Sequence, residues 1–153
     1  MHALFIIDPY HTLNLETETS LLLMQELINR DHQVSVVQVE QLYLLHQKLW
    51  AKTQKVLTVE PWHLGTSQDT TVDDFDVVFI RNDPPFNQRY LHLTYLLDFA
   101  NTKVLNPPQA LRNFNEKLLP LLWPHHAVTS VTTMQPQVLK AFLSTHKKIV
   151  VKP

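Results

Sequence analysis

The sequence predicts a three-layer α/β domain whose central sheet is mostly parallel. Short apolar runs with the length of strands buried on both faces occur at residues 3–8, 33–39, 75–80 and 103–106. Amphipathic segments at residues 16–33 and 88–101 alternate with these runs at helical spacing. A strand, a helix and a strand within about 40 residues form a βαβ unit, whose two strands lie parallel.

The first helix is expected to pack on the sheet through Leu22, Leu23 and Leu27, with Met24 as a further candidate, and Thr17 or Thr19 as its N-terminal cap. The second helix is assigned an apolar side made of Leu91, Tyr95, Leu96 and Phe99. Each helix would then cover the sheet with one apolar stripe.

Residues 41–72 have mixed periodicity and are left open between two hairpin strands and a short helix, with a polar stretch at their end. Leu44, Leu49 and Trp50 in this region are candidates for an interface between copies of a homo-oligomer.

Two short helices, a longer helix and a strand are expected in the last third of the chain. Pro108 can start one short helix, and Asn115 can cap a second that Pro120 bends or stops. A helix at residues 136–146 and a buried strand at residues 147–153 follow. Because that strand has no helix after it, we expect a complete domain at residues 1–119, and at residues 120–153 the opening elements of another domain, which is cut off at the C-terminus.

Composition excludes several classes of protein. The chain has 153 residues, 44% of them hydrophobic, with a net charge of −1, and no segment approaches the length of a membrane span. Dispersed charge of this size gives no general attraction to nucleic acid. The absence of cysteine excludes disulfides and thiolate metal sites, and it is consistent with a cytoplasmic location.

Glycine is also nearly absent, since Gly65 is the single glycine beside ten prolines. A glycine-rich phosphate loop needs several glycines, so this chain contains no such loop.

The adjacent histidines His125 and His126 suggest a metal site, but neighbouring side chains point apart and no further ligand stands at a suitable spacing. We therefore assign no metal ligand and no catalytic residue.

Polar residues follow three of the predicted strands. Asp8 ends the first, Arg81, Asn82 and Asp83 end another, and Asn106 ends the last. Such residues often only cap helices or stop strands, but the carboxyl ends of parallel strands share one edge, where ligands bind.

A dipeptide-like zwitterion needs a guanidinium, a carboxylate and hydroxyl or amide groups. Arg81, Asp83, Ser20 and Asn14 supply that set. The prolines after Asp83 would make the loop that carries it rigid.

Four motifs then occur in a specific order. "FIIDPYHTLNLETETSLLLMQE" resembles the opening of prokaryotic glutathione synthetases, "DVVFIRNDPPFN" resembles their RxDPPFD segment, and "VLNPPQALRNFNEKL" resembles their LRxxNEKL segment. "IVVKP" is similar to the strand that leads to their glycine-rich ATP loop. Asn87 stands where the family usually has Asp, and Asp31 where it often has glycine.

The resemblance implies a Rossmann-like pre-ATP-grasp domain followed by the start of an ATP-grasp domain. It further implies an ATP- and Mg²⁺-dependent ligase that joins γ-glutamylcysteine and glycine through an acyl phosphate. Lys117 and Lys152 match lysines that contact ATP phosphates, and Asp8, Ser20, Arg81 and Asp83 match the substrate side.

The motifs are expected to leave most of the ATP and Mg²⁺ ligands outside these 153 residues, so the chain alone is predicted to be inactive. Two alternatives remain open, namely a non-catalytic binding module with this fold and an ATP-grasp ligase for other peptides or amino acids.

Overall fold

The computed structural model describes residues 1–14, 16–83, 85–115 and 117–152, so Pro84 of the predicted rigid loop, Glu116 and Pro153 lie outside it. The chain forms two compact units, Met1–Asn113 and Phe114–Pro153. These compact units do not test the predicted boundary at residue 119, which separates functional domains, so that boundary stays a prediction.

The first unit is an α/β domain with a seven-stranded sheet in the part of the chain that is described. Its main elements are β1 (His2–Ile7), α1 (Thr19–Asn29), β2 (Gln33–Val37), β3 (Leu42–Leu45), β4 (Lys48–Thr58), β5 (His63–Thr71), β6 (Val77–Arg81), α2 (Gln88–Leu97), β7 (Lys103–Leu105) and α3 (Pro108–Asn113). Strands β2, β1, β6 and β7 pair in parallel in that order, which confirms the predicted α/β class and its parallel strands.

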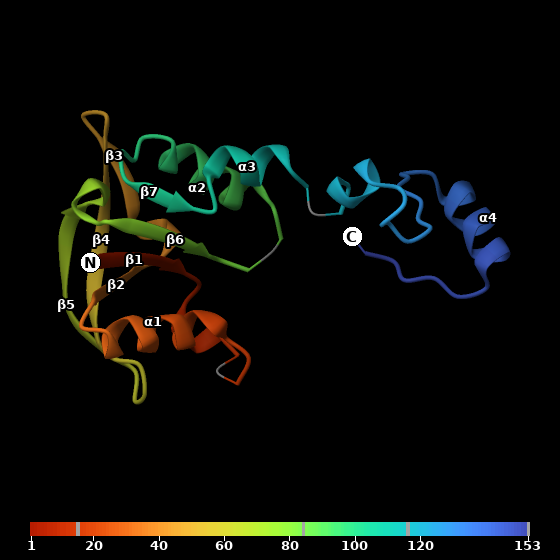
Figure 1. Cartoon of the computed structure of the whole chain (residues 1–153). Coiled ribbons are helices and arrows are strands. Elements are labelled where there is room, and N and C mark those ends of the chain that lie inside the picture. The colour runs from red at the N-terminus through yellow and green to blue at the C-terminus, as the bar shows by residue number, and fades with distance from the viewer. Residues whose placement is uncertain (15, 84, 116, 153) are drawn as a thin grey trace. The chain divides into compact units, whose positions relative to one another are not determined.

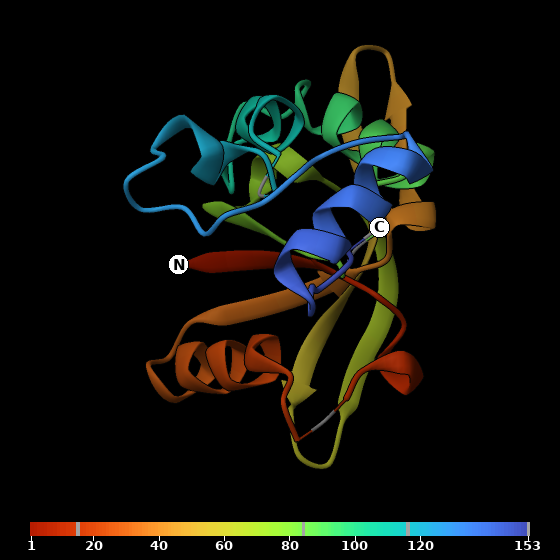
Figure 2. The same cartoon turned by 90° about the vertical axis from the view of Figure 1, so that its right-hand side faces the viewer.

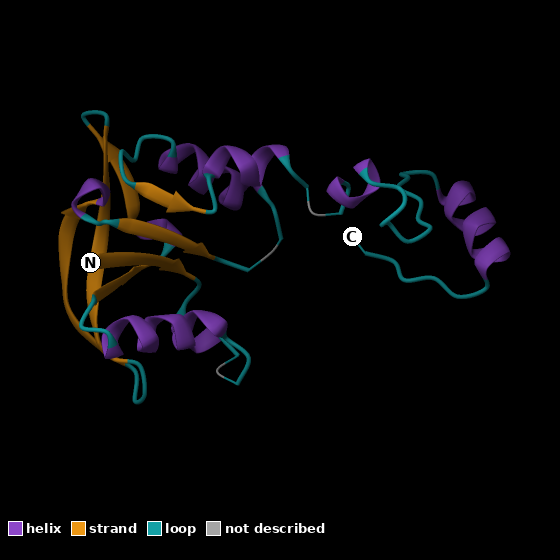
Figure 3. Ribbon diagram, viewed as in Figure 1, coloured by secondary structure: helices purple, strands orange, loops and turns teal. Residues whose placement is uncertain are grey.

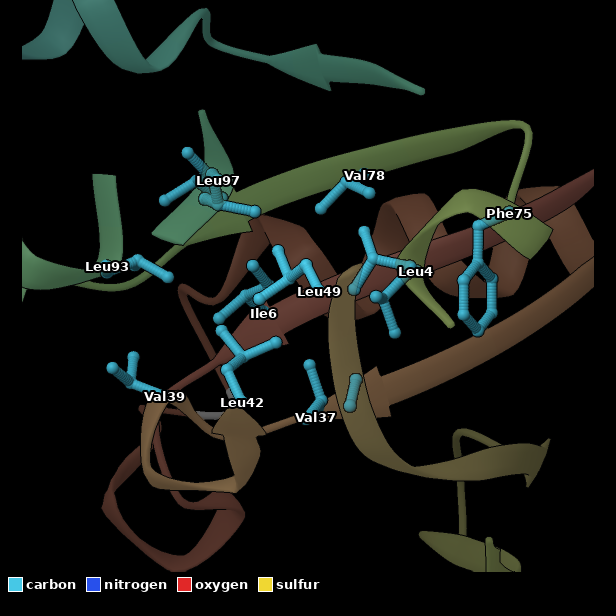
Figure 4. Packing of buried hydrophobic residues seen from close by; sticks show 13 residues of the cluster. Leu4, Ile6, Val37, Val39, Leu42, Leu49, Phe75, Val78, Leu93 and Leu97 are labelled. Carbon is cyan, nitrogen blue, oxygen red and sulfur yellow. The ribbon is translucent and has the colours of Figure 1, made fainter. Parts of the chain in front are cut away.

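The helices cover both faces of the sheet and make three layers, with α1 on one face and α2 and α3 on the other (Figures 1 and 2). Because side chains of a strand alternate between faces, β1 contributes to two cores. Leu4 and Ile6 pack in the core that includes Leu93 and Leu97 of α2, as Figure 4 shows. Ala3, Phe5 and Ile7 pack in the core that includes Leu21 and Met24 of α1.

Residues 41–72 form antiparallel strands, so the hairpin alternative is the correct one. Strand β4 pairs antiparallel with β2, β3 and β5, and it extends the parallel sheet. His46 and Gln47, both with positive φ, make the two-residue turn between β3 and β4. Leu49 is only 2% exposed and belongs to the core, so its assignment to an interface was wrong, while Leu44 is 40% exposed.

The predicted buried faces of the two helices were partly wrong. In α1 the buried apolar side chains are Leu21 and Met24, whereas Leu22 and Leu23 are 71% and 45% exposed. In α2 the buried apolar residues are Leu93 and Leu97, whereas Tyr95 and Phe99 are 50% and 45% exposed. Runs of consecutive apolar residues fit more than one helical face, and the facing strand residues select one of them.

The caps and turns of the first unit are local. Glu18, rather than Thr17 or Thr19, caps α1, because its Oε1 accepts a hydrogen bond from the backbone N–H of Ser20 at 2.8 Å. Asn87 caps α2 by accepting from the N–H of Tyr90 at 3.1 Å. Asp31 has a φ of 58°, a conformation that favours glycine but that Asp tolerates, so an aspartate can stand where the family often has glycine.

The second unit contains a 3₁₀ turn at Leu119–Leu122 and the helix α4 (Pro136–His146), joined by loops (Figure 3). Among the described residues of the second short helix predicted from Asn115 to Trp123, only Leu119–Leu122 are helical, as this 3₁₀ turn. The predicted strand at residues 147–153 is wrong for its described part, where Val150 and Val151 are 85% and 66% exposed. An apolar run forms a strand only when another strand pairs with it, and no residue in the described part of this unit does so.

No helix in the described ranges is both long enough and apolar enough to cross a bilayer.

Candidate functional site

The ends of β1 and β6 are joined through the carboxylate of Asp8. One oxygen, Oδ1, accepts a hydrogen bond from Nδ2 of Asn82 at 3.0 Å, and the other, Oδ2, accepts one from the backbone N–H of Asp83 at 2.8 Å. Because β1 and β6 are neighbouring parallel strands, their carboxyl ends lie at one edge of the sheet, as predicted. Asp8 thus holds Asn82 and Asp83, the first two residues after β6, which we call the β6 exit loop.

Arg81 is directed toward the start of α1. Its Nε donates to Oγ of Ser20 at 2.8 Å, and its Nη2 donates to Oγ1 of Thr19 at 2.6 Å, with Oε1 of Glu18 3.9 Å away. Ser20 is only 1% exposed. Ser20 therefore holds Arg81 in place, and the guanidinium is the group that a ligand can reach, because the Arg81 side chain is 37% exposed.

The opposite charge lies two residues further along the chain. Asp83 is exposed, and its carboxylate has no hydrogen-bond or ion-pair partner among the described residues. Nη1 of Arg81 is likewise left without a partner within the described part of the chain. Since one residue of extended backbone spans about 3.3 Å, the two charged residues are separated by roughly 7 Å of chain.

Asn82 lies between these charges and was not among the predicted site residues. Its amide nitrogen binds Asp8, but its buried Oδ1 has no hydrogen-bond partner within the described residues. A buried acceptor without a donor costs free energy, and such atoms are rare in folded proteins. The sequence places Asn82 at the strand end, but no sequence signal indicates an unsatisfied oxygen.

Two predicted members of the site lie apart from these contacts. Asn14 is exposed, and its Oδ1 accepts a hydrogen bond from the N–H of Glu16 at 3.2 Å in the loop before α1. Asn106 follows β7 at the same edge of the sheet, where it is exposed. Tyr10, in the segment that follows β1, stacks its ring on Trp62 of the turn between β4 and β5, with the ring centroids 4.6 Å apart. This contact supports the segment after β1.

The structure adds Arg89 and Glu40, which sequence reasoning missed. Nη1 of Arg89 lies 3.5 Å from Oδ1 of Asp8, while its Nε and Nη2 both donate to the carboxylate of Glu40. The hydrogen bond from Arg89 lowers the pKa of Glu40, and the same bond raises the pKa of Arg89. These residues are 49 positions apart in the sequence, so no local pattern could have paired them.

Lys117 and Lys152 both belong to the second unit. They line one open cavity of about 1130 Å³ together with hydroxyl groups such as Thr129 and Thr133. The backbone N–H of Lys117 donates to Oδ1 of Asn115 at 2.9 Å. Within the described ranges, no three His, Asp or Glu side chains come together in a way that could hold a metal ion.

The fold and the β6 exit loop define a class, an α/β domain with charged groups at the carboxyl edge of its parallel strands. Comparison with known families makes this specific, because residues 1–112 match the model of the prokaryotic glutathione synthetase N-terminal domain. The chain therefore belongs to the prokaryotic glutathione synthetase N-terminal domain family.

Curated relatives support the same family. The chain is 31% identical to a glutathione synthetase of Salmonella typhimurium and 32% identical to one of Vibrio vulnificus, in both cases over 97% of this chain and 49% of the relative. It is 30% identical to a glutathione synthetase of Nitrosomonas europaea, over 100% of this chain and 51% of the relative. The chain thus spans about half the length of the curated relatives it matches.

Proposed function

We propose that this chain is the N-terminal part of an ATP-dependent ligase that joins γ-glutamylcysteine and glycine, and that its first unit binds the dipeptide. The observation that carries the proposal is the pair of charges on the β6 exit loop and the strand end before it. Nη1 of Arg81 and the carboxylate of Asp83 have no partner in the described part of the chain, and their charges are opposite. A zwitterionic peptide carries the complementary carboxylate and ammonium.

Each residue has a separate task in this proposal. Arg81 binds a substrate carboxylate with the part of its guanidinium that α1 leaves open, and Asp83 binds the ammonium group. Ser20 and Thr19 accept the hydrogen bonds that orient Arg81. Asp8 fixes the loop that carries Asp83.

The second unit is proposed to take part in ATP binding. Lys117 and Lys152 line the same cavity, and lysine is a compact point charge that suits phosphate oxygens. ATP supplies the phosphoryl group that turns the cysteinyl carboxylate into an acyl phosphate, from which the amine of glycine displaces phosphate.

Mg²⁺ fits the described residues poorly, because no cluster of carboxylates is present among them. We therefore derive no step through the metal, and we assign its ligands to a segment outside these 153 residues. Cytoplasmic location and a homo-oligomeric full-length enzyme are part of the same proposal. The absence of cysteine agrees with the location, and the exposed Leu44 with an interface.

Calorimetric titration of the purified chain with γ-glutamylcysteine tests the binding site. Arg81→Gln removes the charge that meets the carboxylate, so the affinity is expected to fall about 10- to 100-fold, the worth of a charge-assisted hydrogen bond. Arg30→Gln is the matched control, since Arg30 is 69% exposed and pairs with Glu26 in the same helix. Equal affinities for wild type and Arg81→Gln would exclude this site.

The activity of the chain alone is tested with a phosphate-release assay. We expect no release that depends on ATP, γ-glutamylcysteine and glycine together. Release that requires all three would show that the chain is active by itself. Titration with other dipeptides separates a glutathione synthetase from a ligase for a different substrate.

A further inference from the structure

Three parts of the first unit meet at Arg89. Arg89 lies in the first turn of α2, Asp8 directly follows β1, and Glu40 lies in the 3₁₀ turn after β2. The guanidinium contacts both carboxylates, with Nε and Nη2 on Glu40 and Nη1 on Asp8. One cation therefore connects segments that are far apart in the sequence.

We propose that Arg89 is a positioning residue of the substrate site, which acts through Asp8 on the β6 exit loop. The two bonds to Glu40 fix the plane of the guanidinium, and this leaves Nη1 directed at Oδ1 of Asp8. The opposite oxygen of Asp8 is then held toward the backbone N–H of Asp83.

The contact chain from Glu40 to Asp83 distinguishes this pair from an ordinary surface ion pair. An isolated exposed pair such as Arg30 and Glu26 joins neighbouring turns of one helix and connects nothing else. Asp8 is only 21% exposed, so its carboxylate has limited access to solvent and depends on its protein donors. The lowered pKa of Glu40 agrees with a close contact between its carboxylate and Arg89.

The contacts of Asn82 indicate why the β6 exit loop depends on Asp8 and Arg89. Its Nδ2 binds the same oxygen of Asp8 that Arg89 approaches, while its buried Oδ1 has no donor within the described residues. The loop therefore carries an unsatisfied group and depends on few contacts, with Asp8 at their centre. Without Arg89, Asp8 would retain only the two donors that the loop itself supplies.

The role of Arg89 rests on the proposed function for its link to substrate, but its effect on the loop can be measured without any ligand. Hydrogen–deuterium exchange of the Asp83 amide, followed by NMR, reports how firmly Asp8 holds the loop. Arg89→Gln is expected to speed this exchange about two- to fivefold, the factor that corresponds to losing one partly exposed ion pair. Arg89→Lys keeps the positive charge but lacks the planar guanidinium, so it should give an exchange rate of the Asp83 amide between those of wild type and Arg89→Gln.

Two controls separate positioning from general loosening. Arg30→Gln removes an arginine that is 69% exposed and directly follows α1, away from Asp8, and it should leave the Asp83 exchange unchanged. The amide of Leu97, which is buried in α2, should exchange at the wild-type rate in Arg89→Gln. Acceleration of both amides by the same factor would mean that α2 itself is loosened, and it would overturn the proposal.

The affinity for γ-glutamylcysteine completes the test, and it should fall by a factor similar to that of the exchange. Unchanged exchange of Asp83 in Arg89→Gln would overturn the proposal, and faster exchange with unchanged affinity would overturn its link to substrate. A wild-type chain that does not bind γ-glutamylcysteine would refute the proposed function, and the exchange experiment would still decide whether Arg89 positions the loop.

Discussion

Asp8→Asn is the substitution that tests the architecture of the site most directly. Asp8 accepts hydrogen bonds from Asn82 and from the backbone N–H of Asp83, and it lies 3.5 Å from Arg89. An asparagine keeps one acceptor but turns an NH₂ group toward a donor, so one of the two hydrogen bonds is replaced by a donor–donor contact. The ion pair with Arg89 is lost as well.

The expected cost follows from these contacts. A hydrogen bond to a charged group contributes about 1.5–3 kcal/mol, and the partial exposure of the Asp8 side chain, 21%, favours the lower part of that range. We therefore expect Asp8→Asn to reduce the free energy of unfolding by about 2 kcal/mol, out of the ~5–15 kcal/mol of a typical domain. With a urea m-value of about 2 kcal/mol/M, the unfolding midpoint should fall by roughly 1 M.

Urea unfolding followed by far-UV circular dichroism measures this shift. Asp74→Asn is the control, because Asp74 is exposed and its carboxylate has no partner among the described residues, so its effect should stay within about 0.5 kcal/mol. If Asp8→Asn and wild type unfold at the same urea concentration, Asp8 does not hold the exit loop and our assignment of its role is wrong.

Further predictions concern Glu40 and α1. Because Arg89 lowers the pKa of Glu40 below its usual 4.5, the pair adds stability above that pH and loses it as the pH falls through the lower folded value. Wild type should thus be more stable than Glu40→Gln at pH 7, and the difference should shrink as the pH is lowered below 4.5, whereas a pH-independent difference would contradict this. Met24→Ala should cost about 2–5 kcal/mol in urea unfolding, because Met24 is fully buried, whereas Leu22→Ala should change little. Equal effects of the two alanine variants would mean that α1 buries a different face.

Much of the fold could be predicted because its signals are local. A short apolar run such as residues 75–80 has strand length, and Pro108 starts a helix where its missing N–H costs nothing. The order of four motifs was enough to indicate the family, which the match over residues 1–112 confirms. The prediction of a strand at residues 147–153 was wrong because a strand depends on a non-local partner. The described part of the chain provides no such partner for these residues.

The amino-acid sequence by itself determined the α/β class, the positions of the parallel strands and the presence of Asp8, Arg81 and Asp83 at one edge of the sheet. Only the tertiary structure decided what these residues bind. Arg81 could have paired with either aspartate, but it binds α1, and Asp8 is instead approached by Arg89, which lies beyond the exit loop in the sequence. Partners 49 to 81 positions apart meet only after the sheet has formed, because the pairing of β1 with β6 and the packing of α2 bring their ends together.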